Sequence, residues 1–153
     1  MDRTDRLAVM LLYSHNISEP NYGPCLKCAL GYYVQNLMPS TPTDLFLFVK
    51  PEYSQQIAQI SWVTKTPNLY IMHLDDSDES SWKIPEWVRP LKVDNTNVGF
   101  NHVWSAGFSN EYRLMGHWRL GFSFPFAKEL GYKYMLQVSG VNSSITELMC
   151  FHH

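Results

Sequence analysis

The sequence lacks a long hydrophobic run and a cluster of basic residues. Its longest uninterrupted apolar run, Leu7–Tyr13, is far shorter than the ~20 residues that cross a bilayer, and a mixed-charge MDRTDR precedes it. We therefore expect neither a signal peptide nor a membrane segment in this chain. Twelve Lys and Arg against fourteen Asp and Glu give a formal net charge of -2. Because no basic patch is available to neutralise a phosphate backbone, nucleic-acid binding is disfavoured.

Cysteine is also scarce. Cys25, Cys28 and Cys150 cannot all pair within the chain and are too few for a disulfide-built scaffold, so they leave the compartment open. Two glycosylation sequons, Asn16-Ile17-Ser18 and Asn142-Ser143-Ser144, would matter only in a secretory protein. With nine asparagines in the chain, about one such match is expected by chance.

The sequence does contain enough large apolar side chains for one core. A length of 153 residues, 45% hydrophobic and 14% aromatic, fits a single domain over 1–153 and is unlike a disordered chain. Short apolar runs alternate with segments of helical periodicity, which predicts an α/β domain with a largely parallel sheet and helices on both faces. The predicted strands are 7–13, 44–49, 69–74 and 132–138, and the first two helices run from Pro24 to just before Pro39 and over Tyr53–Trp62.

The last predicted helix is the longest. From Ser109 or Asn110 as the N-cap it carries an apolar stripe, and Gly131 ends it. Pro125 lies inside this pattern, so we expect a kink there. We expect the helix to pack on the sheet through Met115, Trp118, Phe122 and Phe126.

An acidic segment without periodicity follows the third predicted strand. Within it, Asp76-Ser77-Asp78 is formally an Asp-x-Asp pair. Carboxylates directly after a strand face the edge at which α/β sheets bind ligands. Asp76 and Asp78 are therefore candidate metal ligands, with a solvated acidic loop as the alternative. The six histidines lack the i, i+4 spacing of a helical zinc site, so we expect packing or surface roles for them.

Cys25 and Cys28 form a Cys-x-x-Cys pair where a helix is predicted to follow a strand. A thioredoxin-like oxidoreductase has its redox pair in such a place, because the helix N-terminus lowers the pKa of the first thiol. Pro67 also falls where that family has a cis-proline. The Trp-Cys-Gly-Pro-Cys signature is absent, however, and packing of two small side chains on a helix is the alternative. We predict that the two cysteines are not a redox pair.

The segment 111–138 carries a further pattern. It resembles the Golgi α-1,2-mannosyltransferases of glycosyltransferase family 15, in which a Tyr-Arg-x-Met helix with a later aromatic residue and a Gly-Phe pair leads into a Tyr-x-x-x-Val strand. Upstream, Ile84-Pro-Glu-Trp87 is similar to the family's Trp/Pro/Glu loop. The matching residues in 111–138 are Tyr112, Arg113, Met115, Trp118, Gly121, Phe122, Tyr134 and Val138.

The resemblance implies a partial GT-A sheet, the nucleotide-diphospho-sugar transferase fold, as the donor-side half of a larger glycosyltransferase domain. The implied function is transfer of mannose from GDP-mannose to a glycan or glycoprotein acceptor in the Golgi lumen. Tyr112 and Arg113 would then lie near the nucleotide, with the Arg113 guanidinium offering planar hydrogen bonds to phosphate. The family also implies Mn²⁺ against the diphosphate.

The sequence departs from the family where the last predicted strand ends. The family has an acidic-Pro-Asp tripeptide there, a variant of the Asp-x-Asp metal motif, whereas this chain has Ser139-Gly140-Val141, followed by Asn142. A hard divalent cation prefers carboxylate oxygens, so the metal is lost unless another acid substitutes. The chain also ends at His153, before the half that holds the family's acceptor site. An inactive or truncated transferase is therefore expected, and a non-catalytic binding domain is a further alternative.

Overall fold

The computed structural model describes residues 3–18, 20, 23–74, 82–83, 110–139 and 146–150. The chain divides into two compact units. Residues 1–74 and 126–153 form the first unit, and residues 75–125 form the second. All five strands of the sheet belong to the first unit.

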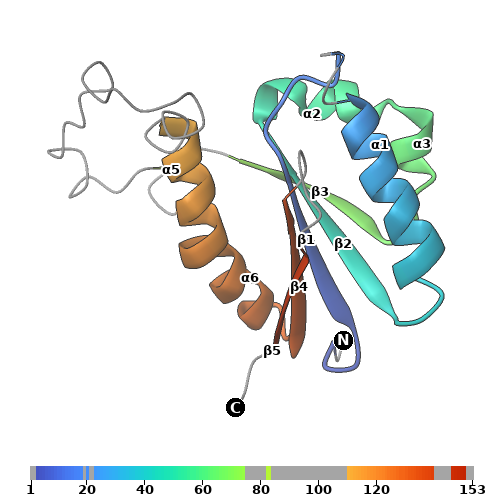
Figure 1. Cartoon of the computed structure of the whole chain (residues 1–153), viewed down its shortest axis with the longest axis vertical. Helices are drawn as coiled ribbons and strands as arrows, with labels where there is room; N and C mark the ends of the chain where they lie inside the picture. The colour runs from blue at the N-terminus through green and yellow to red at the C-terminus, as the bar shows by residue number, and fades with distance from the viewer. Residues whose placement is uncertain are drawn as a thin grey trace, which may run out of the picture. The chain divides into compact units, whose positions relative to one another are not determined.

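The first unit is built on a sheet with the strand order β3-β2-β1-β4-β5 (Figure 1). Strands β1 to β4 run parallel to their neighbours, and β5 is antiparallel to β4. The α/β class, the parallel sheet and its four predicted strands are therefore confirmed. β5 is not expected from the sequence, because its five residues have no clear alternation. The bounds are Leu7–Tyr13 for β1, Thr43–Val49 for β2, Leu69–His73 for β3, Tyr134–Ser139 for β4 and Thr146–Cys150 for β5.

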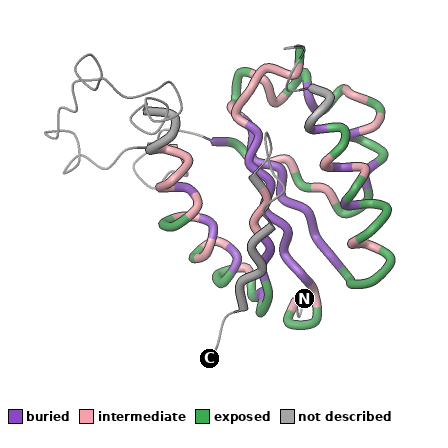
Figure 2. Tube along the Cα trace, in the orientation of Figure 1, coloured by how far each residue is buried: buried purple, intermediate pink, exposed green. Residues whose placement is uncertain are grey.

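One face of the sheet packs against α1 (Gly23–Tyr32), η1 (Tyr33–Leu37), α2 (Pro51–Ala58) and α3 (Ser61–Thr64), which lie together on one side in Figure 1. Strand register aligns alternate residues toward this face. Figure 2 shows that β1 and β2 are buried along their whole length, as expected for a parallel sheet covered on both faces. The core residues on this side are Leu7, Val9, Leu11, Tyr13, Leu26, Leu30, Tyr33, Leu45, Leu47, Val49, Ile57, Val63 and Leu136.

The helices on this face follow the predicted pattern with one difference. In α1 and η1 the stripe of Leu26, Leu30 and Tyr33 is buried, and the helical segment ends at Leu37, just before Pro39, as predicted. The predicted helix 53–62, in contrast, is two helices, α2 and α3. The backbone of Ile60 between them is extended, with φ -76° and ψ 122°, so the helical hydrogen-bond ladder cannot continue through it.

An aromatic cluster covers the opposite face of the sheet. Phe46 and Phe48 on β2 each meet the ring of Phe126 edge to face, with centroids 5.5 Å apart. Phe126 belongs to α6 (Ser123–Glu129), so helices cover both faces of the sheet as predicted. Such ring pairs add about 0.5–1.5 kcal/mol each to the area they bury. The predicted packing of Phe126 on the sheet is confirmed.

The second unit contains α5 (Asn110–His117) and η4 (Trp118–Phe122), which lead into α6. Residues 118–122, just before Pro125, are π-helical, and the kink expected at Pro125 stays a prediction. Pro125 lacks an N–H and its ring crowds the carbonyl four residues earlier, which favours a wider turn just before it. Trp118 is fully buried. Packing of Met115, Trp118 and Phe122 on the sheet stays a prediction. None of the helices in the described ranges is both long enough and apolar enough to cross a membrane.

Gly131 ends α6 in the predicted way. Its φ of +83° lies in the left-handed region that glycine adopts without strain. The Gly131 N–H donates to the Lys128 carbonyl at 3.0 Å, and the Tyr132 N–H donates to the Ala127 carbonyl at 3.1 Å. These two bonds are the Schellman pattern. The turn directs the chain from α6 into the start of β4.

Candidate functional site

The order of the strands reverses direction beside β1. From β1 the chain moves outward through β2 to β3, and it then crosses back to place β4 on the other side of β1. In open α/β sheets, ligands bind outside the carboxyl ends of the strands at such a switch point. The candidate site is therefore the end of the sheet formed by Tyr13 of β1, Val49 of β2, His73 of β3 and Ser139 of β4, which we call the carboxyl edge.

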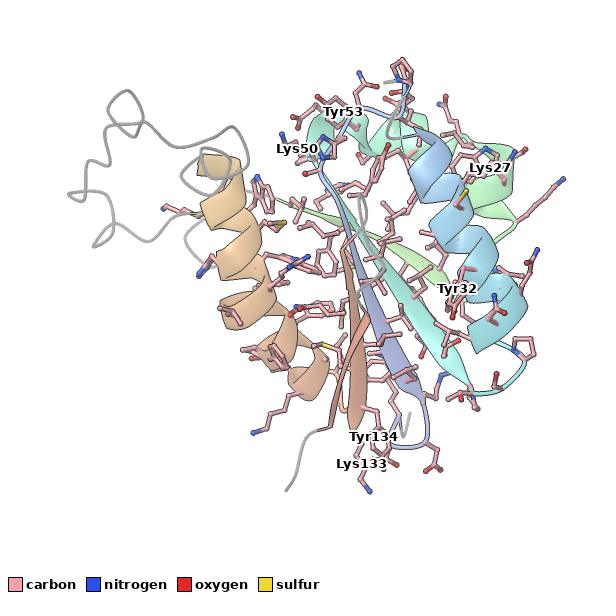
Figure 3. All side chains as sticks on the ribbon, in the orientation of Figure 1. Lys27, Tyr32, Lys50, Tyr53, Lys133 and Tyr134 are labelled. Atoms are coloured by element: carbon pink, nitrogen blue, oxygen red, sulfur yellow. The ribbon has the colours of Figure 1, made fainter. Side chains whose placement is uncertain are left out.

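Three cation-forming side chains lie along the carboxyl edge. His15 follows β1, is half-buried, and meets the buried ring of Tyr13 edge to face with centroids 6.3 Å apart. Lys50 follows β2 and is half-buried, whereas His73 ends β3 and is exposed. Figure 3 shows Lys50 near Tyr53 at the end of the sheet where β1 and β2 finish. Ammonium and imidazole groups donate hydrogen bonds, so these three side chains are suited to oxygen-rich, anionic ligands.

The backbone and neighbouring loops fix the position of this edge. The Leu74 N–H donates to the Val49 carbonyl at 2.7 Å, which extends the pairing of β2 and β3 beyond the last residue of β3. The Gln56 side-chain amide on α2 donates to the Ser18 hydroxyl at 2.9 Å and ties the loop after β1 to α2. α2 itself begins with Pro51 directly after Lys50, a favoured first helical residue. The carboxyl edge is thus held by contacts from three elements.

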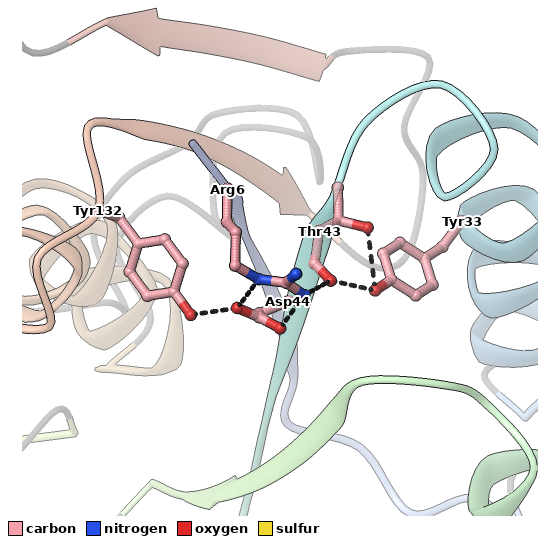
Figure 4. A network of polar contacts seen from close by, with 5 residues as sticks. All are labelled: Arg6, Tyr33, Thr43, Asp44 and Tyr132. Atoms are coloured by element: carbon pink, nitrogen blue, oxygen red, sulfur yellow. Dashed lines mark hydrogen bonds and ion pairs between the residues drawn. The ribbon is translucent and has the colours of Figure 1, made fainter. Parts of the chain in front are cut away.

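The opposite end of the sheet, which we call the amino edge, carries the polar network of Figure 4. The Arg6 guanidinium donates to both oxygens of Asp44, at 2.7 and 2.6 Å, and to the Thr43 carbonyl at 2.8 Å. The Tyr132 hydroxyl donates to the same Asp44 carboxylate at 2.6 Å. Tyr33 joins the network through the Thr43 hydroxyl at 3.2 Å. The network therefore links β1, β2, η1 and the entrance to β4.

Burial and charge set the ionisation of this network. Burial alone would raise the pKa of Asp44, but the hydrogen bonds from Arg6 and Tyr132 outweigh it and lower that pKa. Burial, followed by the hydrogen bond to Asp44, raises the pKa of Tyr132. Only 6% of the Asp44 side chain is exposed, against 27% for Arg6, so the pair is largely desolvated. A satisfied, ionised cluster at the amino edge holds strands together; ligand sites of α/β sheets lie at the other end.

None of the predicted site residues belongs to the described residues of the first unit. Tyr112 and Arg113 lie in α5 of the second unit, and their side chains are outside what the structure describes. Asp76 and Asp78 lie outside the described residues altogether. The nucleotide-binding roles of Tyr112 and Arg113 and the metal roles of Asp76 and Asp78 therefore stay predictions.

The end of β4 does not provide a metal site of the family type. β4 ends at Ser139, and the sequence continues with Gly140, Val141 and Asn142, none of which carries a carboxylate. Within the described parts of the chain, no group of three or more His, Cys, Asp or Glu side chains is close enough to hold a metal ion.

Cys25 and Cys28 lie in the first two turns of α1. Cys28 is an exposed free thiol, and it lies off the stripe of Leu26 and Leu30 that is buried against the sheet, as predicted. The side chain of Cys25 is outside the described set. The described residues contain no cis peptide bond, so the bond before Pro67 is trans.

Sequence reasoning missed most of the side chains at the two edges. Packing or surface roles are expected for the histidines, yet His15 follows the predicted strand 7–13 and His73 lies near the end of the predicted strand 69–74, so both share one end of a parallel sheet. Asp44, an acid opening an otherwise apolar strand, was a signal for a buried partner, and Arg6 directly before β1 was the matching cation.

Comparisons of the chain with protein-family models, with curated proteins and with solved structures found no match.

Proposed function

We propose that this chain binds a nucleotide-diphospho-sugar at the carboxyl edge, as a donor-binding domain of the GT-A glycosyltransferase type related to family 15. GDP-mannose is the proposed donor. A glycan or glycoprotein acceptor and a Golgi lumenal location belong to the same proposal. The observation that carries it is the reversal of strand order between β1 and β4, which is the topology with which α/β sheets bind nucleotides.

The fold of the segment 111–138, which carries the resemblance, supports this proposal. The segment 111–138 was expected to form a helix followed by a strand of the same sheet as 7–13. Its last part is β4, paired in parallel with β1 over Leu7 to Leu12, and its helix ends at Gly131 as expected. Had 132–138 lain outside the sheet, the donor-binding interpretation would have failed.

The side chains at the carboxyl edge match the chemistry of the donor. A nucleotide-diphospho-sugar carries two phosphate charges and a flat base. Lys50 supplies an ammonium charge for the diphosphate, and His15 beside Tyr13 supplies an aromatic surface with a hydrogen-bonding group. By resemblance, Arg113 is a second candidate for a phosphate contact and Tyr112 for a contact near the nucleotide.

Catalytic turnover is not part of the proposal. The family's Mn²⁺ does not fit the end of β4, where serine, glycine and valine replace the acidic tripeptide. Asp76 and Asp78 are the remaining candidate ligands. If they act so, Asp76→Ala combined with Asp78→Ala abolishes Mn²⁺ binding measured by calorimetry, and the parent chain binds Mn²⁺ whether or not donor is present.

Donor binding is tested by comparing two lysines at opposite ends of the sheet. Figure 3 shows Lys50 at the carboxyl edge and Lys133 at the amino edge, beside Tyr134. We expect Lys50→Ala to weaken GDP-mannose binding about ten-fold, the loss of about 1.4 kcal/mol for one charge-assisted contact. Lys133→Ala removes the same charge and should leave affinity within two-fold.

Isothermal titration of the full chain supplies the measurement, with GDP and ADP as competitors. If both lysine variants weakened GDP-mannose binding equally, the loss of affinity would follow from the net charge of the chain. This result would contradict a site at the carboxyl edge. Binding of ADP as tight as that of GDP-mannose would overturn the choice of donor. In parallel, insulin reduction lost on Cys25→Ser would favour the thioredoxin-like alternative.

A further inference from the structure

The loop after β1 contains the sequon Asn16-Ile17-Ser18 in a defined conformation. Ile17, its middle residue, is partly buried and packs against the core of the first unit. On either side of this anchor, Asn16 is half-buried and Ser18 is exposed. Ile17 therefore fixes the sequon against the core, with Ser18 exposed and Asn16 partly accessible.

Hydrogen bonds order the same three residues. The Ser18 backbone N–H donates to the Asn16 side-chain oxygen at 2.9 Å, which closes a turn over the sequon. The Gln56 amide on α2 donates to the Ser18 hydroxyl at 2.9 Å. The sequon thus lies in an ordered turn, with the Asn16 side chain half-buried and the Ser18 side chain exposed.

We propose that Asn16 is an acceptor for an N-linked glycan. The donor is a lipid-linked oligosaccharyl diphosphate, supplied with its transferase by the secretory pathway. The Asn16 side-chain nitrogen forms a bond to the anomeric carbon of the first sugar, the bond from that carbon to the diphosphate oxygen breaks, and the diphosphate leaves with the electron pair. The nitrogen gives one proton to a base of the transferase. The hydroxyl residue two positions on, Ser18, is the element that the transferase requires.

This inference rests on the proposed function for one point only, the lumenal location. Asn16 is next to His15 in the sequence, so a glycan on it would adjoin the carboxyl edge at which we propose donor binding. Donor titrations therefore use chain from a host without N-glycosylation. The occupancy of Asn16 by a glycan is measured separately, so failure of either proposal does not affect the test of the other.

The test uses the full chain behind a cleavable signal peptide in cultured animal cells. Asn142→Gln is the background, which removes the second sequon. Total cell lysate is treated with peptide N-glycosidase in ¹⁸O-water, and the peptide containing position 16 is analysed by mass spectrometry. Because the glycan is added while the chain enters the lumen, a variant that folds poorly is still scored. We expect the Asn16 peptide to carry the ¹⁸O-labelled aspartate left by deglycosylation.

Four variants sharpen the result. Asn16→Gln and Ser18→Ala should each abolish the glycan, whereas Ser18→Thr should retain it. Asn36→Gln, a matched change of an exposed asparagine outside any sequon, should leave occupancy unchanged. An Asn16 peptide recovered entirely unmodified, or a glycan that survives Ser18→Ala, would overturn the proposal.

Discussion

The two edges of the sheet are built from different chemistry. At the amino edge, Arg6, Asp44 and Tyr132 satisfy one another in a largely buried network. At the carboxyl edge, Lys50 is half-buried and His73 is exposed, both within reach of solvent. The same four parallel strands thus carry a largely buried, paired network at one end and the basic side chains of Lys50 and His73, within reach of solvent, at the other.

This difference suggests that the amino edge stabilises the fold and that the carboxyl edge binds ligand. A parallel sheet puts all its strand starts at one end, where charges can be paired permanently across elements that are distant in sequence. It puts all its strand ends at the other, where loops of variable sequence collect. We therefore expect substitutions at the amino edge to change the free energy of unfolding and substitutions at the carboxyl edge to change ligand affinity.

The largest expected effect on stability is that of Asp44→Ala. The substitution leaves the Arg6 guanidinium and the Tyr132 hydroxyl without their shared acceptor in a mostly buried place. We expect a loss of about 2–3 kcal/mol in the free energy of unfolding, below the value for a fully buried pair because Arg6 is partly exposed. Denaturant unfolding measures it. Asp5→Ala, at an exposed position, is the control and should cost less than about 0.5 kcal/mol.

Lowering the pH should gradually remove the contribution of Asp44 to the free energy of unfolding. The pKa of Asp44 is lowered from 3.8 in the folded chain, so between the folded and unfolded values the unfolded state binds more protons. The stabilisation is present in full above about pH 5 and is lost as the pH falls below 3.8 and through the folded pKa. The difference in unfolding free energy between the parent and Asp44→Asn should therefore be constant near neutrality and shrink in acid. A difference that grew on acidification would refute the assignment.

Tyr132→Phe isolates one bond of the network. It removes the hydroxyl that donates to Asp44 and retains the ring beside Phe46. We expect a loss of about 1.5–2 kcal/mol, at the lower end of the range for a hydrogen bond to a charged group. Thermal unfolding measures this loss. Tyr134→Phe, a matched change at a residue that is 37% exposed, should be nearly neutral in the same measurement. Equal effects of the two changes would argue against a special role for the hydroxyl.

A smaller effect is expected at the turn that leads into β4. A Cβ at Gly131 meets no atom within 4 Å, so Gly131→Ala tests only the left-handed backbone with φ +83°. We expect a loss of about 1 kcal/mol. Gly31→Ala is the matched control, because its Cβ also meets nothing within 4 Å but its backbone is helical, and it should stabilise the chain by up to about 1 kcal/mol. Thermal unfolding should show a lower melting temperature for Gly131→Ala and a higher one for Gly31→Ala.

Most of the fold could be predicted from local patterns. The apolar runs at 7–13 and 44–49 are long enough to indicate buried strands, and Gly131 after an apolar helical stripe indicates a C-terminal cap. The break at Ile60 and the strand Thr146–Cys150 could not be predicted, because the first depends on a single backbone angle and the second on pairing with β4.

The candidate site was less predictable for a physical reason. Asp44 and Tyr132 are 88 residues apart in sequence, so their hydrogen bond follows from strand order and from no local motif. The same holds for His15, Lys50 and His73, which share an edge only because β1, β2 and β3 are parallel. Motif reasoning led instead to Tyr112, Arg113, Asp76 and Asp78, whose roles stay predictions.

Backbone amide chemical shifts during a GDP-mannose titration test the central claim most directly. If the carboxyl edge binds the donor and the amino edge serves stability, the shifts cluster at residues 13–18, 49–53, 73–74 and 138–139. Residues 6–8, 43–45 and 132–135 should then stay unchanged. Shifts concentrated at the amino edge, or no shifts at millimolar donor in a folded chain, would contradict the account.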